Sequence, residues 1–121
     1  MNPIKEHKAL IEGMVARTPS PGAYLVRTES LFSKAKTHKH LNDLVAKLTT
    51  DERELLAQML EHEKSDGIFQ ALVHISEACT LGGLKLVKDG MEIPPEPFGY
   101  TLFEEYITLL HETGDWSSME K

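Results

Sequence analysis

The chain has 121 residues, with 13 Lys and Arg against 19 Asp and Glu, so its formal net charge is −6. This length predicts a single domain over residues 1–121, and the acidic balance argues against a general binder of nucleic acids or anionic membranes. The single cysteine cannot form an internal disulfide, which argues against a small secreted scaffold and favours the cytoplasm.

The sequence lacks the signatures of membrane insertion, secretion and the large catalytic families. No window holds the ~20 apolar residues that a transmembrane helix needs. Charged residues interrupt the N-terminal segment MNPIKEHKALIEG, which therefore does not resemble a signal peptide. The chain has no phosphate-binding glycine loop, no HExxH, no CxxC and no GxSxG. We expect no catalytic residues, no metal and no cofactor, and the sequence favours a protein that is not an enzyme.

The first half of the chain is predicted to form two helical regions. Apolar residues at helical spacing predict a helix over residues 3–17, which the two prolines of the segment 18–22 end. A second helical region spans about residues 23–48. The polar run 33–40 interrupts it, which fits a bend or a second helix start near residues 37–40. The pattern Thr-Thr-Asp-Glu at residues 49–52 then predicts a capping box and a new helix.

The segment 51–79 is predicted to be helical, but its apolar side changes along its length. The apolar residues of its two halves fall on opposite sides of a helical wheel: Leu55, Leu56, Met59 and Leu60 in the first half, and Ile68, Phe69, Leu72, Ile75 and Cys79 in the second. Two interpretations stay open: the helix breaks near Gly67, or one long helix packs its two halves on different partners. We favour the continuous helix because Gly67 is its single helix breaker and no proline accompanies it.

The C-terminal third combines a hairpin with a last helix. Gly82-Gly83 is expected to end the preceding helix, and Asp89-Gly90 between short apolar runs predicts a β-hairpin over about residues 84–93. A stiff proline-rich arm, residues 94–97, leads to a helix over about residues 101–112.

The predicted end of the chain completes a mainly α fold. Gly114 is expected to end the last helix, and Trp116 either caps the hydrophobic core or fills a partner's pocket. The predicted fold class is therefore mainly α: a compact bundle of four to five helices with one short β-hairpin packed on it, because a two-stranded hairpin is marginal alone.

One family resemblance covers about residues 51–116. The run ERELLAQMLEHEKSDGIFQALVHISE, followed by GLKLVKDGMEIPPEPFG, a helix and GDW, resembles a small uncharacterised bacterial protein family, a domain of unknown function. The resemblance implies a compact domain of its own. It implies no activity and no functional residues.

A polar stripe on the third predicted helix is the main candidate ligand site. Carboxylates and imidazoles on facing helices are how helical bundles hold divalent metals and polar ligands. A second contribution is expected from Glu104, Glu105 or His111 on the last helix. The competing interpretation is a solvated helix face. The candidate ligand-binding residues are Glu63, Asp66, Gln70, His74, Glu77 and His111.

A local basic cluster stands out from the acidic chain. Such a cluster can bind a phosphate or an acidic partner, although solubilising surface charge is the commoner role. Its members are Arg27, Lys34, Lys36, Lys39 and Lys47.

Two histidines and the cysteine are expected neither to bind a metal nor to react. His38 and His40 point apart on a helix, so they are not expected to form a metal-binding pair. Cys79 is expected to be a buried core thiol rather than a nucleophile.

Two function hypotheses follow from these patterns. The first is a non-catalytic binding or interaction module that self-associates as a homodimer, because a helix with two apolar sides has more to bury than one small bundle covers. A protein partner also fits, whereas nucleic acid and membrane do not. The second is a metal- or small-ligand-dependent enzyme or binding protein that uses the stripe.

Overall fold

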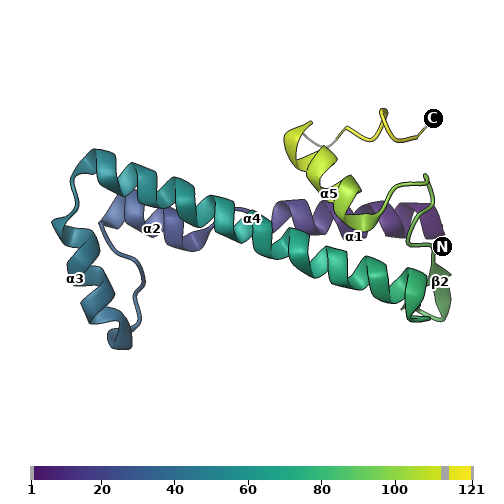
Figure 1. The fold of residues 1–121 in the computed structure, drawn as a ribbon, viewed down its shortest axis with the longest axis horizontal. Coiled ribbons are helices and arrows are strands. Elements are labelled where there is room, and N and C mark those ends of the chain that lie inside the picture. The colour runs from purple at the N-terminus through teal and green to yellow at the C-terminus, as the bar shows by residue number, and fades with distance from the viewer. Residues whose placement is uncertain (1, 113–114, 121) are drawn as a thin grey trace. The chain divides into compact units, whose positions relative to one another are not determined.

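A computed structural model describes residues 2–112 and 115–120 (Figure 1). The mainly α fold with one short hairpin is confirmed. The described elements are α1 (Pro3–Ala16), α2 (Pro21–Glu29), the 3-10 turn η1 (Lys36–His38), α3 (Lys39–Lys47), α4 (Thr50–Leu81), β1 (Leu86–Lys88), β2 (Met91–Ile93) and α5 (Leu102–His111). They form two compact units: unit 1, made of Met1–Arg17 and Gly67–Lys121, and unit 2, made of Thr18–Asp66.

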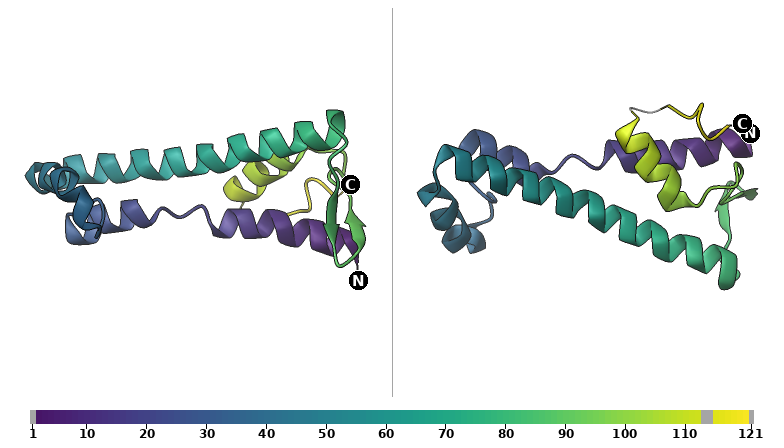
Figure 2. Two further views of the ribbon diagram at one scale, coloured as in Figure 1. Left: turned by 90° about the horizontal axis from the view of Figure 1, so that it is seen from below. Right: turned by 45° about the horizontal axis from the view of Figure 1, so that its top comes forward.

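Unit 1 packs α1, the hairpin and α5 around an apolar core, and α5 lies beside α1 in Figures 1 and 2. The Asn2 side chain caps α1 by accepting the backbone N–H of Ile4 at 3.0 Å, and a reciprocal capping box of Thr101 and Glu104 starts α5. Trp116 belongs to this core, so it takes the first of its two expected roles. The buried core residues are Ile11, Leu72, Leu102, Tyr106, Leu109, Trp116 and Met119.

The predicted hairpin is confirmed with a shorter extent. β1 and β2 are antiparallel, and Leu86 pairs with Ile93. Asp89 and Gly90 both have positive φ, 50° and 78°, as a tight two-residue turn requires. The expected helix-ending role of Gly114 lies outside the described residues.

Unit 2 packs α2 and α3 beside the first part of α4 (Figures 1 and 2). The predicted helical region 23–48 is interrupted earlier than expected, since α2 ends at Glu29 and Ser30 adopts a left-handed φ of 55°. The helical path resumes at Lys36 with η1, close to the expected second start. The buried core residues are Ala23, Val26, Val45 and Ala57, with Phe32, Leu56 and Leu60 packed on them.

The helix α4 is continuous through Gly67, as favoured from the sequence. The Thr49–Glu52 capping box is present, with Glu52 N–H donating to Thr49 Oγ1 at 3.1 Å. At the other end Gly83 has a φ of 73°, and the backbone N–H of Leu84 donates to the carbonyl of Ala78 at 3.0 Å. Glycine therefore ends this helix where a left-handed residue is required.

The apolar residues of α4 divide between two cores and an exposed set. The residues Leu56, Ala57 and Leu60 join the core of unit 2, but Leu55 and Met59 are exposed. The residues that α4 gives to unit 1 are Ile68, Phe69, Leu72 and Ile75. One helix thus supplies residues to both cores and leaves Leu55 and Met59 exposed.

Candidate functional site

The predicted polar stripe lies on the exposed surface. Glu63, Asp66, Gln70, His74 and Glu77 are exposed on α4, and His111 is exposed on α5. None of these side chains forms a hydrogen bond or an ion pair with another described residue. Over residues 2–112 and 115–120, no three His, Cys, Asp or Glu side chains gather closely enough to hold a metal ion. The geometry supports the solvated-face interpretation, and ligand binding at the stripe stays a prediction.

A buried ionisable pair joins α1 to α5. His7 Nε2 lies 2.9 Å from both carboxylate oxygens of Glu105, and both side chains are 0% exposed. Sequence reasoning gave His7 no role and named Glu105 only as an addition to the stripe. A signal was present, because His7 falls between Ile4 and Ile11 on the apolar side of its helix.

Aromatic rings surround this pair. Phe98 and Trp116 lie edge-on to the His7 ring, with centroids 6.2 and 6.3 Å away. Lys8 covers both aromatic rings with its Nζ 5.7 Å from each centroid, and it is ion-paired to Glu120. The second ring nitrogen of His7 is buried with no hydrogen-bond partner among the described residues. Because no solvent reaches either member, the pair suits a polar clamp between helices rather than a reacting centre.

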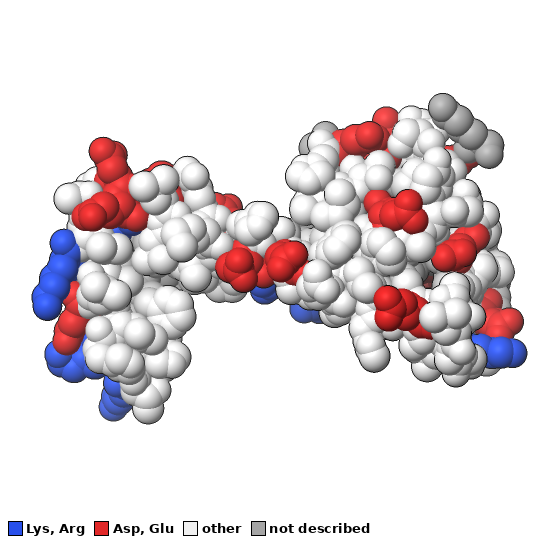
Figure 3. Space-filling model, viewed as in Figure 1, with Lys and Arg blue, Asp and Glu red and all other residues white. Residues whose placement is uncertain are grey.

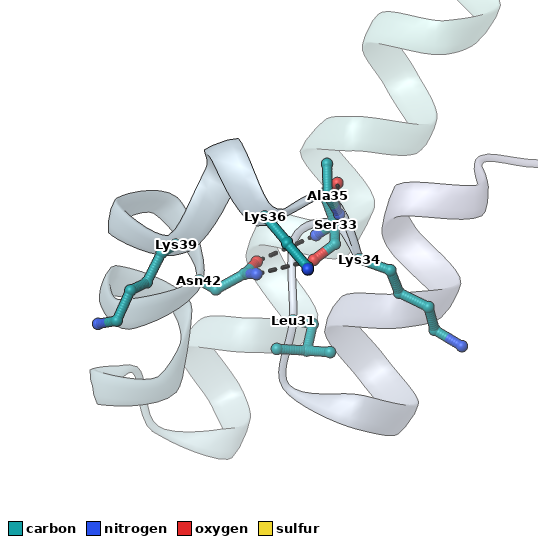
Figure 4. A pocket seen from close by; sticks show the side chains of 7 residues that line it. All are labelled: Leu31, Ser33, Lys34, Ala35, Lys36, Lys39 and Asn42. Atoms are coloured by element: carbon teal, nitrogen blue, oxygen red, sulfur yellow. Dashed lines mark hydrogen bonds between the residues drawn. The ribbon is translucent and has the colours of Figure 1, made fainter.

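A pocket of about 530 Å³ opens in unit 2, at the loop between α2 and α3 (Figure 4). Its lining combines lysines with small and apolar side chains. The lining residues are Leu31, Ser33, Lys34, Ala35, Lys36, Lys39 and Asn42. In Figure 4, Lys34 and Lys39 extend to opposite sides and Lys36 lies between them.

Asn42 holds the wall of this pocket in place. Its Oδ1 accepts the backbone N–H groups of Phe32 at 2.8 Å and Ser33 at 3.0 Å, while its Nδ2 donates to the carbonyl of Ser33 at 2.7 Å. All three bonds connect α3 to the irregular segment that follows α2. Asn42 thus ties to α3 a segment that has no regular secondary structure.

The structure divides the predicted basic cluster into two parts. Arg27 is bound to acids of α4, with its Nε 2.8 Å from Glu54 Oε2 and its Nη2 2.6 Å from Glu61 Oε1. The hydrogen bonds to Glu54 and Glu61 raise the pKa of Arg27, and the bond from Arg27 is the main cause that lowers the pKa of Glu54 to about 2. Arg27 therefore holds α2 on α4, whereas all four lysines of the cluster are exposed. Lys34, Lys36 and Lys39 line the pocket, and Lys47 does not. Figure 3 shows basic side chains gathered over the α3 region.

An exposed apolar row lies on α4 in unit 2. Leu55 is 60% exposed and Met59 is 63% exposed, and they are one helical turn apart. Single exposed apolar side chains occur on most proteins. Two such side chains one turn apart on a helix form a continuous apolar surface.

Cys79 is half-buried near the end of α4. Burial, and then the negative charge of Glu96, raise the pKa of its thiol. The raised pKa disfavours the thiolate, which is the nucleophilic form.

The helices of the described residues offer no membrane span. None of them combines the length and the apolar character that crossing a bilayer demands.

Comparison with known proteins identifies the family but no activity. The chain belongs to a family of unknown function (DUF6547), whose model matches residues 1–116. The match extends the resemblance seen over residues 51–116 to nearly the whole chain. No curated protein and no solved structure matches the chain significantly.

Proposed function

We propose that this member of a family of unknown function is a non-catalytic interaction module that self-associates as a homodimer. The observation that carries the proposal is the exposed apolar row of Leu55 and Met59 on α4. The core residues of unit 2 on this helix leave the row uncovered. Burying such a row between two copies removes apolar surface from water at about 25 cal/mol per Å².

A second copy of the chain fits the row by symmetry. In a two-fold antiparallel pairing whose axis crosses α4 at the level of Ala57, Leu55 of one copy meets Met59 of the other, because the two positions are equidistant from that level. The same pairing sets Asp51 opposite Glu63, and both are exposed acids. Like charges at the rim oppose the apolar attraction, so the proposed dimer is strengthened by added salt.

The proposal also covers the cellular location of the protein and the class of its partners. A cytoplasmic location is supported by the single cysteine, which cannot form an internal disulfide. The bacterial origin implied by the resemblance stays a prediction. A protein partner other than a second copy would use the same row, whereas the charge of −6 disfavours nucleic acid and anionic membranes.

Sedimentation equilibrium tests self-association over a range of protein and salt concentrations. We expect a monomer–dimer equilibrium that Leu55→Gln with Met59→Gln abolishes. The matched control is Leu44→Gln, because Leu44 is 59% exposed on α3 of the same unit. Circular dichroism checks that each variant folds. A monomer at all concentrations, or a dimer that only Leu44→Gln disrupts, contradicts the proposal.

A further inference from the structure

We propose that the pocket of unit 2 binds a small organic phosphate. Lys34, Lys36 and Lys39 would hold the phosphate group, and Leu31 and Ala35 would contact the organic part. This site is separate from the apolar row of α4 and does not depend on self-association.

The charge of the segment supports an anionic ligand. Residues 30–42 contain three lysines and no Asp or Glu, in a chain whose net charge is −6. The Lys36 side chain has no ion pair or hydrogen bond with any described residue. Lys34 lies 3.6 Å from Glu29, and Lys39 lies 2.7 Å from Asp43; both lysines are largely exposed, and exposed pairs of this kind are weak. All three lysines can therefore turn towards a bound anion at little cost.

The size and lining of the pocket support an organic ligand rather than a bare ion. A pocket of about 530 Å³ lies within the range that holds small organic ligands, roughly 300–1,000 Å³. The Leu31 and Ala35 side chains add apolar surface to a lining that also holds the three lysines (Figure 4). An anion with an attached ring or alkyl group uses both features, and inorganic phosphate uses only one.

The lining also favours a phosphate over a carboxylate or a long polyanion. A phosphate monoester carries about −1.5 to −2 charges near neutral pH and offers three acceptor oxygens, which suits several lysines better than one carboxylate does. The cationic surface is short, and the acidic remainder of the chain repels an extended nucleic acid. The Asn42 side chain holds the backbone of this lining in place through Phe32 and Ser33, so binding has to order the lysine side chains but not the loop.

Titration followed by amide NMR tests this site with three probes: phenyl phosphate, inorganic phosphate and benzoate. We expect phenyl phosphate to bind most tightly and to shift the amide signals of residues 31–42. Lys36→Gln should weaken binding by about two- to fivefold, the range that an exposed charge pair contributes. The triple variant Lys34→Gln, Lys36→Gln, Lys39→Gln should show no saturable binding.

The matched control is Lys47→Gln, because Lys47 is exposed on α3 but does not line the pocket. It should leave the affinity for phenyl phosphate unchanged. Three results overturn the proposal: signal shifts confined to other residues, equal weakening by Lys47→Gln and Lys36→Gln, or phenyl phosphate binding no more tightly than inorganic phosphate or benzoate. Each variant is shown to be folded when its amide signals, apart from those near the mutation, match those of the unchanged protein.

Discussion

His7 Nε2 is equidistant from the two carboxylate oxygens of Glu105, at 2.9 Å from each, inside a core that water does not reach. The contact joins residues 98 positions apart and so fixes the packing of α1 on α5. Breaking a buried pair leaves one member without compensation, which costs far more than the intact pair contributes.

Removing one member of this pair is expected to destabilise the protein by about 3–5 kcal/mol. We expect this loss for His7→Leu and for Glu105→Leu, measured by urea unfolding. The double variant should lose less than either single variant, because two apolar side chains leave no buried polar group. Glu12→Gln, an exposed change on α1, is the control and should have little effect. Additive losses in the double variant would contradict the clamp.

The Arg27–Glu54 contact predicts that the stability of the protein falls at acidic pH. The hydrogen bond from Arg27, with a second one from Gln58, lowers the folded-state pKa of Glu54 from 4.5 to about 2. A depressed folded-state pKa stabilises the fold above the unfolded-state value near 4.5, and this contribution is lost as pH falls through about 2. NMR titration of the Glu54 carboxyl in Arg27→Gln should show its pKa returning towards the ordinary value. In the control variant Lys47→Gln the pKa of Glu54 should stay low. A Glu54 pKa that also stays low in Arg27→Gln would show that Arg27 is not the cause of the shift.

Asn42 is expected to control the loop between α2 and α3. Asn42→Ala removes two acceptor contacts and one donor contact, and unpaired partly buried groups cost about 1–3 kcal/mol. Asn42→Asp should be intermediate, since it keeps the acceptor but places a carboxylate against the carbonyl of Ser33. Hydrogen exchange at the amides of Phe32 and Ser33 measures the effect directly. Unchanged protection in Asn42→Ala would show that the loop is held by other contacts.

Replacing Gly67 inside α4 and Gly83 just after it by alanine should change the stability of the protein in opposite directions. Gly67 lies inside the helix, and a Cβ there meets nothing within 4 Å, so Gly67→Ala should stabilise by about 0.5–1 kcal/mol. Gly83 has a φ of 73°, so Gly83→Ala should destabilise by about 1–2 kcal/mol through backbone strain. Thermal unfolding of the two variants gives the signs. The same sign in both would contradict either the continuous helix or its glycine end.

Local patterns were sufficient to predict most of the helices and the hairpin turn. The spacing of apolar residues located α1, α4 and α5, and Asp89-Gly90 located the turn, because these signals depend on neighbours in the sequence. The break at Ser30 comes earlier than predicted. The segment after it is held by the Asn42 side chain, which bonds to residues nine and ten positions away and so leaves no local signal.

The candidate sites were less predictable than the elements. The helical wheel places Leu55 and Met59 on one apolar side with Leu56 and Leu60, although only the latter two pack in unit 2. Which arc of an apolar helix is covered depends on the neighbouring helices, and sequence spacing does not specify them. The lysine cluster was visible in the sequence. The binding of Arg27 to α4 was not, because it joins helices that are separate in the chain.

The continuity of α4 has a consequence for how the chain folds. Starting a helix is costly, whereas extending one adds a hydrogen bond for each residue fixed. Once either core has formed around its part of the 32-residue helix, the remaining part can grow from an existing end. The nucleation cost is then met once for both cores, and the two units are expected to melt in one cooperative transition rather than in two steps.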